Sequence, residues 1–175
     1  TLIKILKRAK QLIQNGEDIF SSSSLKIFLK NNYTIDHFKE NDVILETFSK
    51  LDDHDIYSCI KEWSNHNDFI LSSLSNRILN RKPLKIKTQN EKFLEKEINK
   101  LKQKVSEKYN ISIDNTNYLV FTGKVSNNAY QYHKTHINIL MKNGEIKDIT
   151  DASDQFNIDA LSKTVNKYFL CYPKM

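Results

Sequence analysis

The 175-residue sequence has few of the residues that interrupt regular structure, with only three glycines and two prolines. Most of the chain is therefore expected to be helix and strand rather than linker. No apolar run approaches the ~20 residues needed to cross a bilayer. The basic N-terminus also lacks the apolar stretch and cleavage site of a signal peptide. The sequence accordingly predicts a soluble, cytoplasmic protein.

Cysteine is equally scarce. Cys59 and Cys171 are too few for a disulfide framework and are typical of a reducing compartment. Cys59 shares a helical face with Ile56 and Ile60, so we expect it to pack rather than react. The sequence also contains no P-loop, no GxGxxG and no GxSxG motif. The sequence therefore contains none of these common motifs from which a nucleotide-binding or nucleophilic residue could be assigned.

The charge balance is mildly basic, with a net charge of +6 and a pI near 9.1. Such an excess suits anionic partners such as nucleotides or nucleic acid, although Lys-rich solvated faces would give the same number. Hydrophobic residues make up 39% of the chain, which is long enough for one large domain or two small ones.

Apolar residues at helical spacing predict that the first half of the chain is all helical. The first helix covers Leu2–Ile13, and Gly16 ends it. Residues suited to N-caps open the helices that follow: Ser21–Ser24, Thr34, Asn41 or Asp42, Asp52 or Asp53, and Asn67. Because the periodicity is already under way at residue 2, without an initiator Met, we expect the chain to be a piece of a longer polypeptide.

The predicted secondary structure changes from helix to strand at Pro83, because proline cannot continue a helix. Leu84–Lys87 alternates like a strand with one solvated face. A helix is predicted over 91–109, with its apolar residues on the inside: Phe93, Leu94, Ile98, Leu101 and Val105. Strands are predicted over 118–122, 136–141 and 145–149, and Asn143-Gly144 is a hairpin signal between the last two. A helix from Asn157 or Asp154 to Lys163 and a strand over 167–173 complete the prediction. The predicted class is α+β: a helical region over 1–82, then a small ferredoxin-like α+β domain over 83–175.

Two cations stand at the junction between these halves. Arg81 and Lys85 are four residues apart, with Lys82 and Lys87 nearby. Arginine supplies a planar fork of donors and lysine a mobile point charge, so this pair can grip a polyphosphate. The alternative interpretation is a polar helix end that binds nothing.

The junction, with Arg81, Pro83, Leu84 and Lys85, resembles the R-x-[L/P]-[F/L]-K segment downstream of the catalytic core in HD-domain dNTP triphosphohydrolases. The C-terminal KYFLCYPK resembles the tail of a bacterial branch of these phosphohydrolases. The resemblance implies that residues 1–82 are the C-terminal portion of an HD-type helical domain. It also implies metal-dependent hydrolysis of dNTPs to nucleoside and triphosphate, with Arg81 and Lys85 in a regulatory nucleotide site.

Members of that family hold divalent metal with a His, a distant His-Asp doublet and a further Asp. The one doublet here is His54-Asp55, and His37 is the only earlier histidine, so we interpret the doublet as part of a helix cap. No catalytic or metal-binding residue is therefore assigned, and the metal is expected upstream of Thr1. The implied partners are that upstream HD core, further copies of the chain, and dNTP or GTP. The alternative is a non-catalytic α+β module that binds a protein or, less favoured, single-stranded nucleic acid.

Three further groups of polar residues are candidates for ligand binding. His133 and His136 approach a strand, where their side chains would point to opposite faces, so they do not predict a metal site. The acidic loop with Asp148, Asp151 and Asp154 lacks the Gly and distal Glu of an EF-hand. A surface loop or subunit contact is the preferred interpretation of three more residues, although they could bind a ligand or an RNA base: Asn127, Asn128 and Tyr130.

Overall fold

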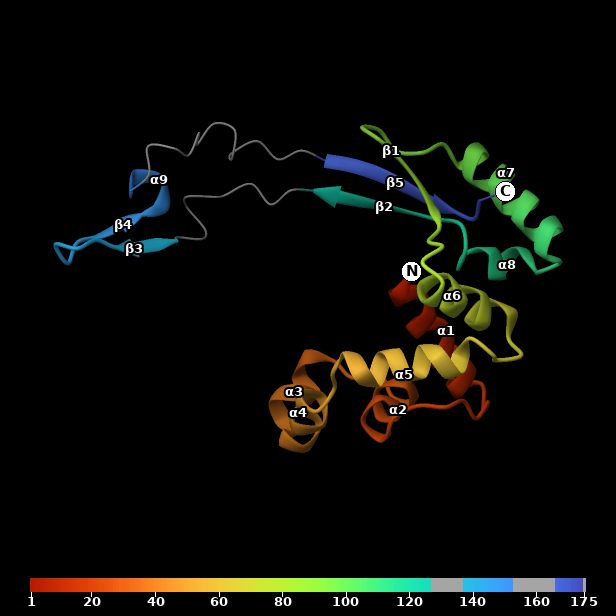
Figure 1. Cartoon of the computed structure of the whole chain (residues 1–175), viewed down its shortest axis with the longest axis horizontal. Helices are drawn as coiled ribbons and strands as arrows, with labels where there is room; N and C mark the ends of the chain where they lie inside the picture. The colour runs from red at the N-terminus through yellow and green to blue at the C-terminus, as the bar shows by residue number, and fades with distance from the viewer. Residues whose placement is uncertain (127–136, 153–165, 175) are drawn as a thin grey trace. The chain divides into compact units, whose positions relative to one another are not determined.

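The computed structural model describes residues 1–126, 137–152 and 166–174. The elements, in chain order, are α1 (Leu2–Gln14), α2 (Ser23–Lys30), α3 (Ile35–Glu40), α4 (Asp42–Ser49), α5 (Asp53–Trp63), α6 (Phe69–Leu79), β1 (Lys85–Gln89), α7 (Glu95–Tyr109), α8 (Ile113–Thr116), β2 (Phe121–Ser126), β3 (Asn138–Leu140), β4 (Ile146–Asp148), α9 (Ile149–Ala152) and β5 (Asn166–Tyr172) (Figure 1). The α+β class is confirmed, since the described part of the chain is helical up to residue 79 and all its strands follow residue 84.

The described residues pack into two compact units. The first comprises Thr1–Ile86, Leu94–Phe121 and Cys171–Met175, and the second lies within Lys87–Phe93 and Thr122–Leu170. The division into domains 1–82 and 83–175 stays a prediction, because compact packing does not decide which segments fold independently.

Apolar stripes of α1, α2, α5 and α6 form the core of the first unit. Ile5 and Ala9 of α1 are fully buried, as are Leu71 and Leu74 of α6. The buried Trp63 of α5 is also satisfied as a polar group, because its Nε1–H donates to the Phe20 carbonyl at 2.8 Å. This core packs α6 against α1 and α5.

Cys59 is fully buried in α5, which confirms that it packs. Burial raises the pKa of its thiol, so the side chain stays protonated at neutral pH.

Local sequence signals place most helix ends correctly. The Ser22 hydroxyl accepts the Leu25 N–H at the start of α2, and Asn41 caps α4. Gly16 follows α1 with a φ of +92°, which glycine adopts without strain. Two helix starts differ from the prediction. Asp68, rather than Asn67, caps α6 and accepts the Leu71 N–H at 2.8 Å, and the helix predicted over 91–109 begins only at Glu95.

Helices α3 and α4 bury no residue among those described. They are held to α2 by an aromatic cluster whose ring centroids lie 5.6 to 6.3 Å apart: Phe28, Tyr33, Phe38 and Phe48. Large apolar side chains remain exposed here, including Val43 at 69% and Leu45 at 50%. This surface therefore departs from the usual polar exterior.

Three predictions about burial and strand position are wrong. Leu119 and Val120 are buried in a turn, because both backbone N–H groups donate to the Thr116 carbonyl and β2 begins only at Phe121. Leu94 is 74% exposed, since it is the extended N-cap of α7 and its side chain leaves the helix face. Ile86 is 62% exposed, and its neighbours Lys85 and Lys87 are exposed too, so β1 buries neither face at this point.

The described strands form a three-stranded sheet in the order β1-β5-β2 and a separate antiparallel hairpin of β3 and β4. The ferredoxin-like detail of the prediction differs, because that arrangement has one sheet. In the hairpin Asn138 lies opposite Asp148, and Gly144 turns with a φ of +82°, as the Asn143-Gly144 signal predicts. The predicted helix ending at Lys163 lies outside the described residues.

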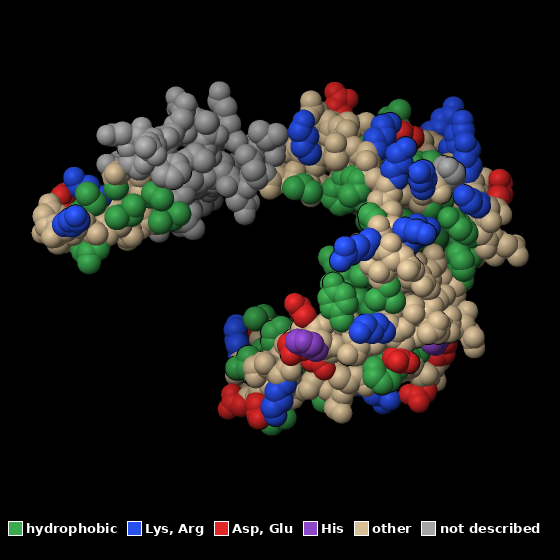
Figure 2. Space-filling model, in the orientation of Figure 1, with side chains coloured by type: hydrophobic (Ala, Val, Ile, Leu, Met, Phe, Trp, Pro, Cys, Tyr) green, Lys and Arg blue, Asp and Glu red, His purple; other side chains and the backbone are tan. Residues whose placement is uncertain are grey.

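Within the first unit, Lys and Arg side chains gather over α7 (Figure 2). Four lysines spaced one turn apart are exposed along this helix: Lys96, Lys100, Lys104 and Lys108. Among the described residues, no helix combines the length and apolar character needed to cross a bilayer.

Candidate functional site

Helix α6 ends in a Schellman motif that determines where Arg81 lies. The Arg81 N–H donates to the Ile78 carbonyl at 3.1 Å, and the Lys82 N–H donates to the Arg77 carbonyl at 2.9 Å. Arg81 takes the left-handed position of this motif, with a φ of 53°, where glycine is favoured. A side chain there costs about 1 kcal/mol. An arginine at a position with this conformational cost suggests that its side chain has a functional role.

Arg81 and Lys85 are both exposed, and Lys85 is the first residue of β1. Leu84, between them, is only 4% exposed and anchors the junction to the first unit. Among the described residues, no carboxylate pairs with Arg81 or Lys85. The junction therefore presents two solvent-facing cations whose charges are available to an anionic ligand.

The His54-Asp55 doublet is part of a helix cap, as predicted. The Asp52 carboxylate accepts the backbone N–H groups of His54 at 2.7 Å and Asp55 at 3.2 Å. Asp55 in turn accepts the Asp52 N–H at 3.1 Å, which completes a capping box. The N–H groups of Asp55 and His54 lower the pKa of Asp52, so the cap persists at neutral pH.

No group of three or more His, Cys, Asp or Glu side chains within residues 1–126, 137–152 and 166–174 could hold a metal ion. The residues described therefore do not fit the divalent metal that the family resemblance implies. No catalytic step through a metal follows from this chain.

The other sequence candidates are only partly described. Asp148 is 8% exposed and lies in β4, not in a loop, while Asp151 belongs to α9. The remaining candidates lie outside the described residues, and predictions about them stay predictions: Asn127, Asn128, Tyr130, His133, His136 and Asp154.

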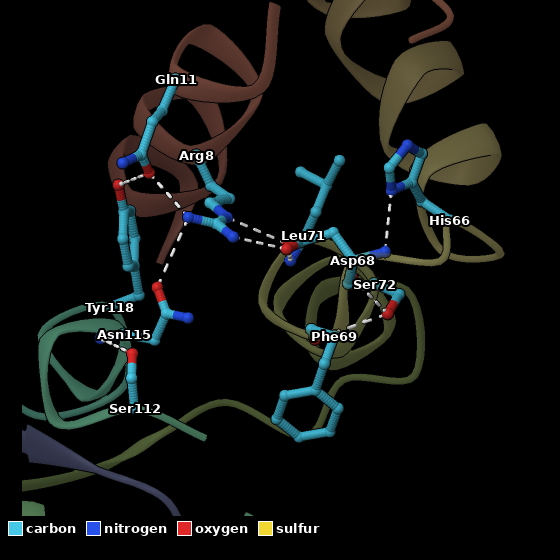
Figure 3. Close-up of polar contacts among 10 residues, drawn as sticks. All are labelled: Arg8, Gln11, His66, Asp68, Phe69, Leu71, Ser72, Ser112, Asn115 and Tyr118. Atoms are coloured by element: carbon cyan, nitrogen blue, oxygen red, sulfur yellow. Dashed lines mark hydrogen bonds and ion pairs between the residues drawn. The ribbon is translucent and has the colours of Figure 1, made fainter. Parts of the chain in front are cut away.

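An ion pair that the sequence does not predict joins Arg8 and Asp68 (Figure 3). Arg8 Nε lies 3.0 Å from Asp68 Oδ1, and Arg8 Nη2 lies 2.5 Å from Oδ2, with both side chains mostly buried. Arg8 Nη1 also donates to Gln11 at 2.7 Å, and the Tyr118 hydroxyl donates to the same Gln11 oxygen at 2.8 Å. Two weak signals existed: an arginine beside the apolar stripe of α1, and an acid directly before the apolar start of α6.

Burial by itself would raise the pKa of Asp68, but the Arg8 hydrogen bonds, the Leu71 N–H, and the charges of Arg8 and His66 outweigh it. The net pKa of Asp68 is lowered. The hydrogen bonds to Asp68 raise the pKa of Arg8. The pair thus stays ionised at neutral pH and ties α1 to the first turn of α6, the helix that ends at Arg81.

The chain resembles a solved structure over nearly its whole length. That structure is the crystal structure, at 2.20 Å resolution, of a phosphohydrolase from Bacteroides thetaiotaomicron VPI-5482, with a TM-score of 0.83 and 40% sequence identity. The match covers 99% of this chain and 43% of that chain. No protein-family model and no curated protein matches the sequence. In sequence and fold, the chain is similar to one part, less than half, of a phosphohydrolase.

Proposed function

We propose that this chain is the C-terminal part of a metal-dependent HD-family phosphohydrolase that converts deoxynucleoside triphosphates to nucleoside and triphosphate. Support comes from its similarity to part of a phosphohydrolase and from the resemblance of its Arg81–Lys85 segment to the dNTP triphosphohydrolases. Water would attack the α-phosphate, and a divalent metal held by the rest of the polypeptide would polarise a phosphoryl oxygen. This chain would contribute binding and assembly rather than chemistry.

Its binding contribution is a regulatory nucleotide site that includes Arg81 and Lys85. The observation that carries this part is the left-handed φ of 53° at Arg81. Glycine would suit that backbone better, so the arginine occupies this position at a conformational cost. Phosphate oxygens would accept charge-assisted hydrogen bonds from both side chains, worth ~1.5–3 kcal/mol each.

Its assembly contribution is contact with further copies of the chain through α3 and α4. The support is the exposure of Val43, Leu45 and Phe48, at 69%, 50% and 53%. Light scattering with the full-length protein tests this part. Val43→Asp should lower the molar mass, because a charge opposes burial of an apolar contact. An unchanged mass would contradict the role of α4.

An activity assay tests the proposed function. The full-length protein is incubated with dGTP and Mg²⁺ or Mn²⁺, and the products are separated by chromatography. The expected products are deoxyguanosine and triphosphate in equal amounts, while the 175-residue chain alone should release neither. Release of diphosphate or monophosphate, or turnover by the chain alone, would contradict the proposal.

The second candidate is single-stranded nucleic acid binding through α7. The four exposed lysines one turn apart favour it, since such a row can follow a phosphate backbone. Fluorescence anisotropy with a labelled oligonucleotide tests it. Binding that weakens steeply with salt and is reduced by Lys100→Gln with Lys104→Gln would support this function, whereas no binding at low salt would exclude it.

A further inference from the structure

A second cationic site on the first unit includes Lys82 but neither Arg81 nor Lys85. A pocket of about 500 Å³ is formed by the turn between α5 and α6, one face of α6 and the residue Lys82. Its lining includes His66, Phe69, Asn76, Arg77 and Lys82, but no Asp or Glu. Neither Arg81 nor Lys85 lines it, so the inference below does not depend on the proposed regulatory site.

Arg77 lines this pocket and supplies a partly buried positive charge. Its side chain is half-buried, and its Nε atom is buried without a hydrogen-bond partner among the described residues. Its one hydrogen bond to a described residue runs from Nη2 to the Tyr109 hydroxyl at 3.4 Å, and no described carboxylate pairs with it. Arg8, the other half-buried arginine of the unit, has a carboxylate partner in Asp68. A buried charge normally needs such a partner, and at Arg77 the open pocket is where an anion could supply it.

The remaining wall of the pocket is held in place by internal hydrogen bonds. Asn76 Nδ2 donates to the Ser64 carbonyl at 2.7 Å, which fixes the turn against α6. His66 Nδ1 accepts the Asp68 N–H at 3.0 Å, so in the neutral ring Nε2 carries the hydrogen. Figure 3 shows this second nitrogen directed away from Asp68. Phe69 is 39% exposed and adds ring surface.

We propose that this pocket binds a small phosphorylated compound with a flat ring, its phosphate on Arg77 and Lys82 and its ring against Phe69. Phosphate fits because Arg77 offers a fork of donors and Lys82 a mobile charge, with no acid in the lining to repel it. An aromatic face supports a flat ring by stacking.

Calorimetric titration of the full-length protein tests this proposal, with inorganic phosphate and adenosine 5′-monophosphate as probes. The unmodified protein should bind both, and the nucleotide more tightly. Lys82→Gln should weaken binding of both about tenfold, and Arg77→Gln by more, because each removes a charge-assisted bond. Lys82 is exposed, so its replacement leaves the fold intact even if Arg77→Gln unfolds the protein.

Two control variants separate this site from the others. Lys92→Gln removes an exposed lysine that lies outside the proposed sites, and it should leave phosphate binding unchanged. Arg81→Ala removes the proposed regulatory contact, so binding that survives in this variant does not belong to the regulatory site. The proposal is overturned if phosphate does not bind at millimolar concentration, if Lys82→Gln binds it as the unmodified protein does, or if Arg81→Ala alone abolishes binding. Equal affinity for phosphate and the nucleotide would overturn the role of Phe69.

Discussion

Arg8 and Asp68, sixty residues apart in the sequence, form a two-bond ion pair that joins α1 to the start of α6. The same carboxylate caps α6 through the Leu71 N–H. Asp68→Ala should therefore lower the free energy of unfolding by roughly 2–3 kcal/mol, because it leaves the Arg8 charge unpaired and removes the cap. Chemical denaturation measures the change.

The matched control is Asp18→Ala. Asp18 pairs with Lys26 at 3.0 Å, but its side chain is 89% exposed, so its removal should cost less than about 0.5 kcal/mol. Equal losses for the two variants would contradict a special role for the buried pair.

The lowered pKa of Asp68 makes a prediction about acid stability. A carboxyl group whose folded pKa lies below its unfolded value, ~3.9, stabilises the fold above that value. The contribution disappears as the pH falls through the folded pKa. In denaturation from pH 7 to pH 2.5, Asp68→Asn should lose less stability below about pH 4 than the unmodified protein. Parallel curves for the two proteins would show that folding does not lower the pKa of Asp68.

The backbone at Arg81 predicts a stabilising substitution. Arg81→Gly should raise the free energy of unfolding by about 1 kcal/mol, since glycine adopts a positive φ without strain. Arg81→Ala should not, because alanine keeps the strain. Asn110 supplies the control: its φ is 50°, but asparagine tolerates this region, so Asn110→Gly should give a smaller gain. A loss of stability in Arg81→Gly would contradict the conformational account.

Gly123 in β2 lies under the ring of Phe169 in β5, which fills the space that a Cβ would occupy. Gly123→Ala should cost roughly 1–3 kcal/mol, because the ring must move. A second change, Phe169→Leu, should recover part of that loss when combined with Gly123→Ala. Additive losses in the double variant would show that the two residues are independent.

The features that the sequence predicts correctly depend on neighbouring residues. Asp52 caps the helix that begins at the next residue, and Gly16 and Gly144 turn the chain where their flanking residues require it. Helix type, most helix starts and the hairpin follow from such short-range chemistry. The positions of Arg81 and Lys85 at a helix–strand junction follow in the same way from Pro83.

Features that depend on distant residues could not be predicted. The partner of Arg8 is sixty residues away, and no periodicity relates them. The apolar run Leu119-Val120 has the composition of a strand, but the Thr116 carbonyl accepts hydrogen bonds from both backbone N–H groups. The segment therefore forms a turn. From the sequence alone Arg77 is one of several charges near the end of a helix. The fold shows that it is half-buried and that no described carboxylate pairs with it.

The proposed function requires Arg81 to contact a nucleotide in the full-length protein. Calorimetric titration of dGTP or GTP into that protein and its Arg81→Ala variant tests it most directly. We expect affinity about ten- to a hundredfold weaker in the variant, because ~1.5–3 kcal/mol of charge-assisted bonding is lost. Arg81→Lys should also bind more weakly, since a point charge cannot replace the fork. Equal affinities for the unmodified protein and Arg81→Ala would contradict the claim and leave Arg81 as a residue that only ends a helix.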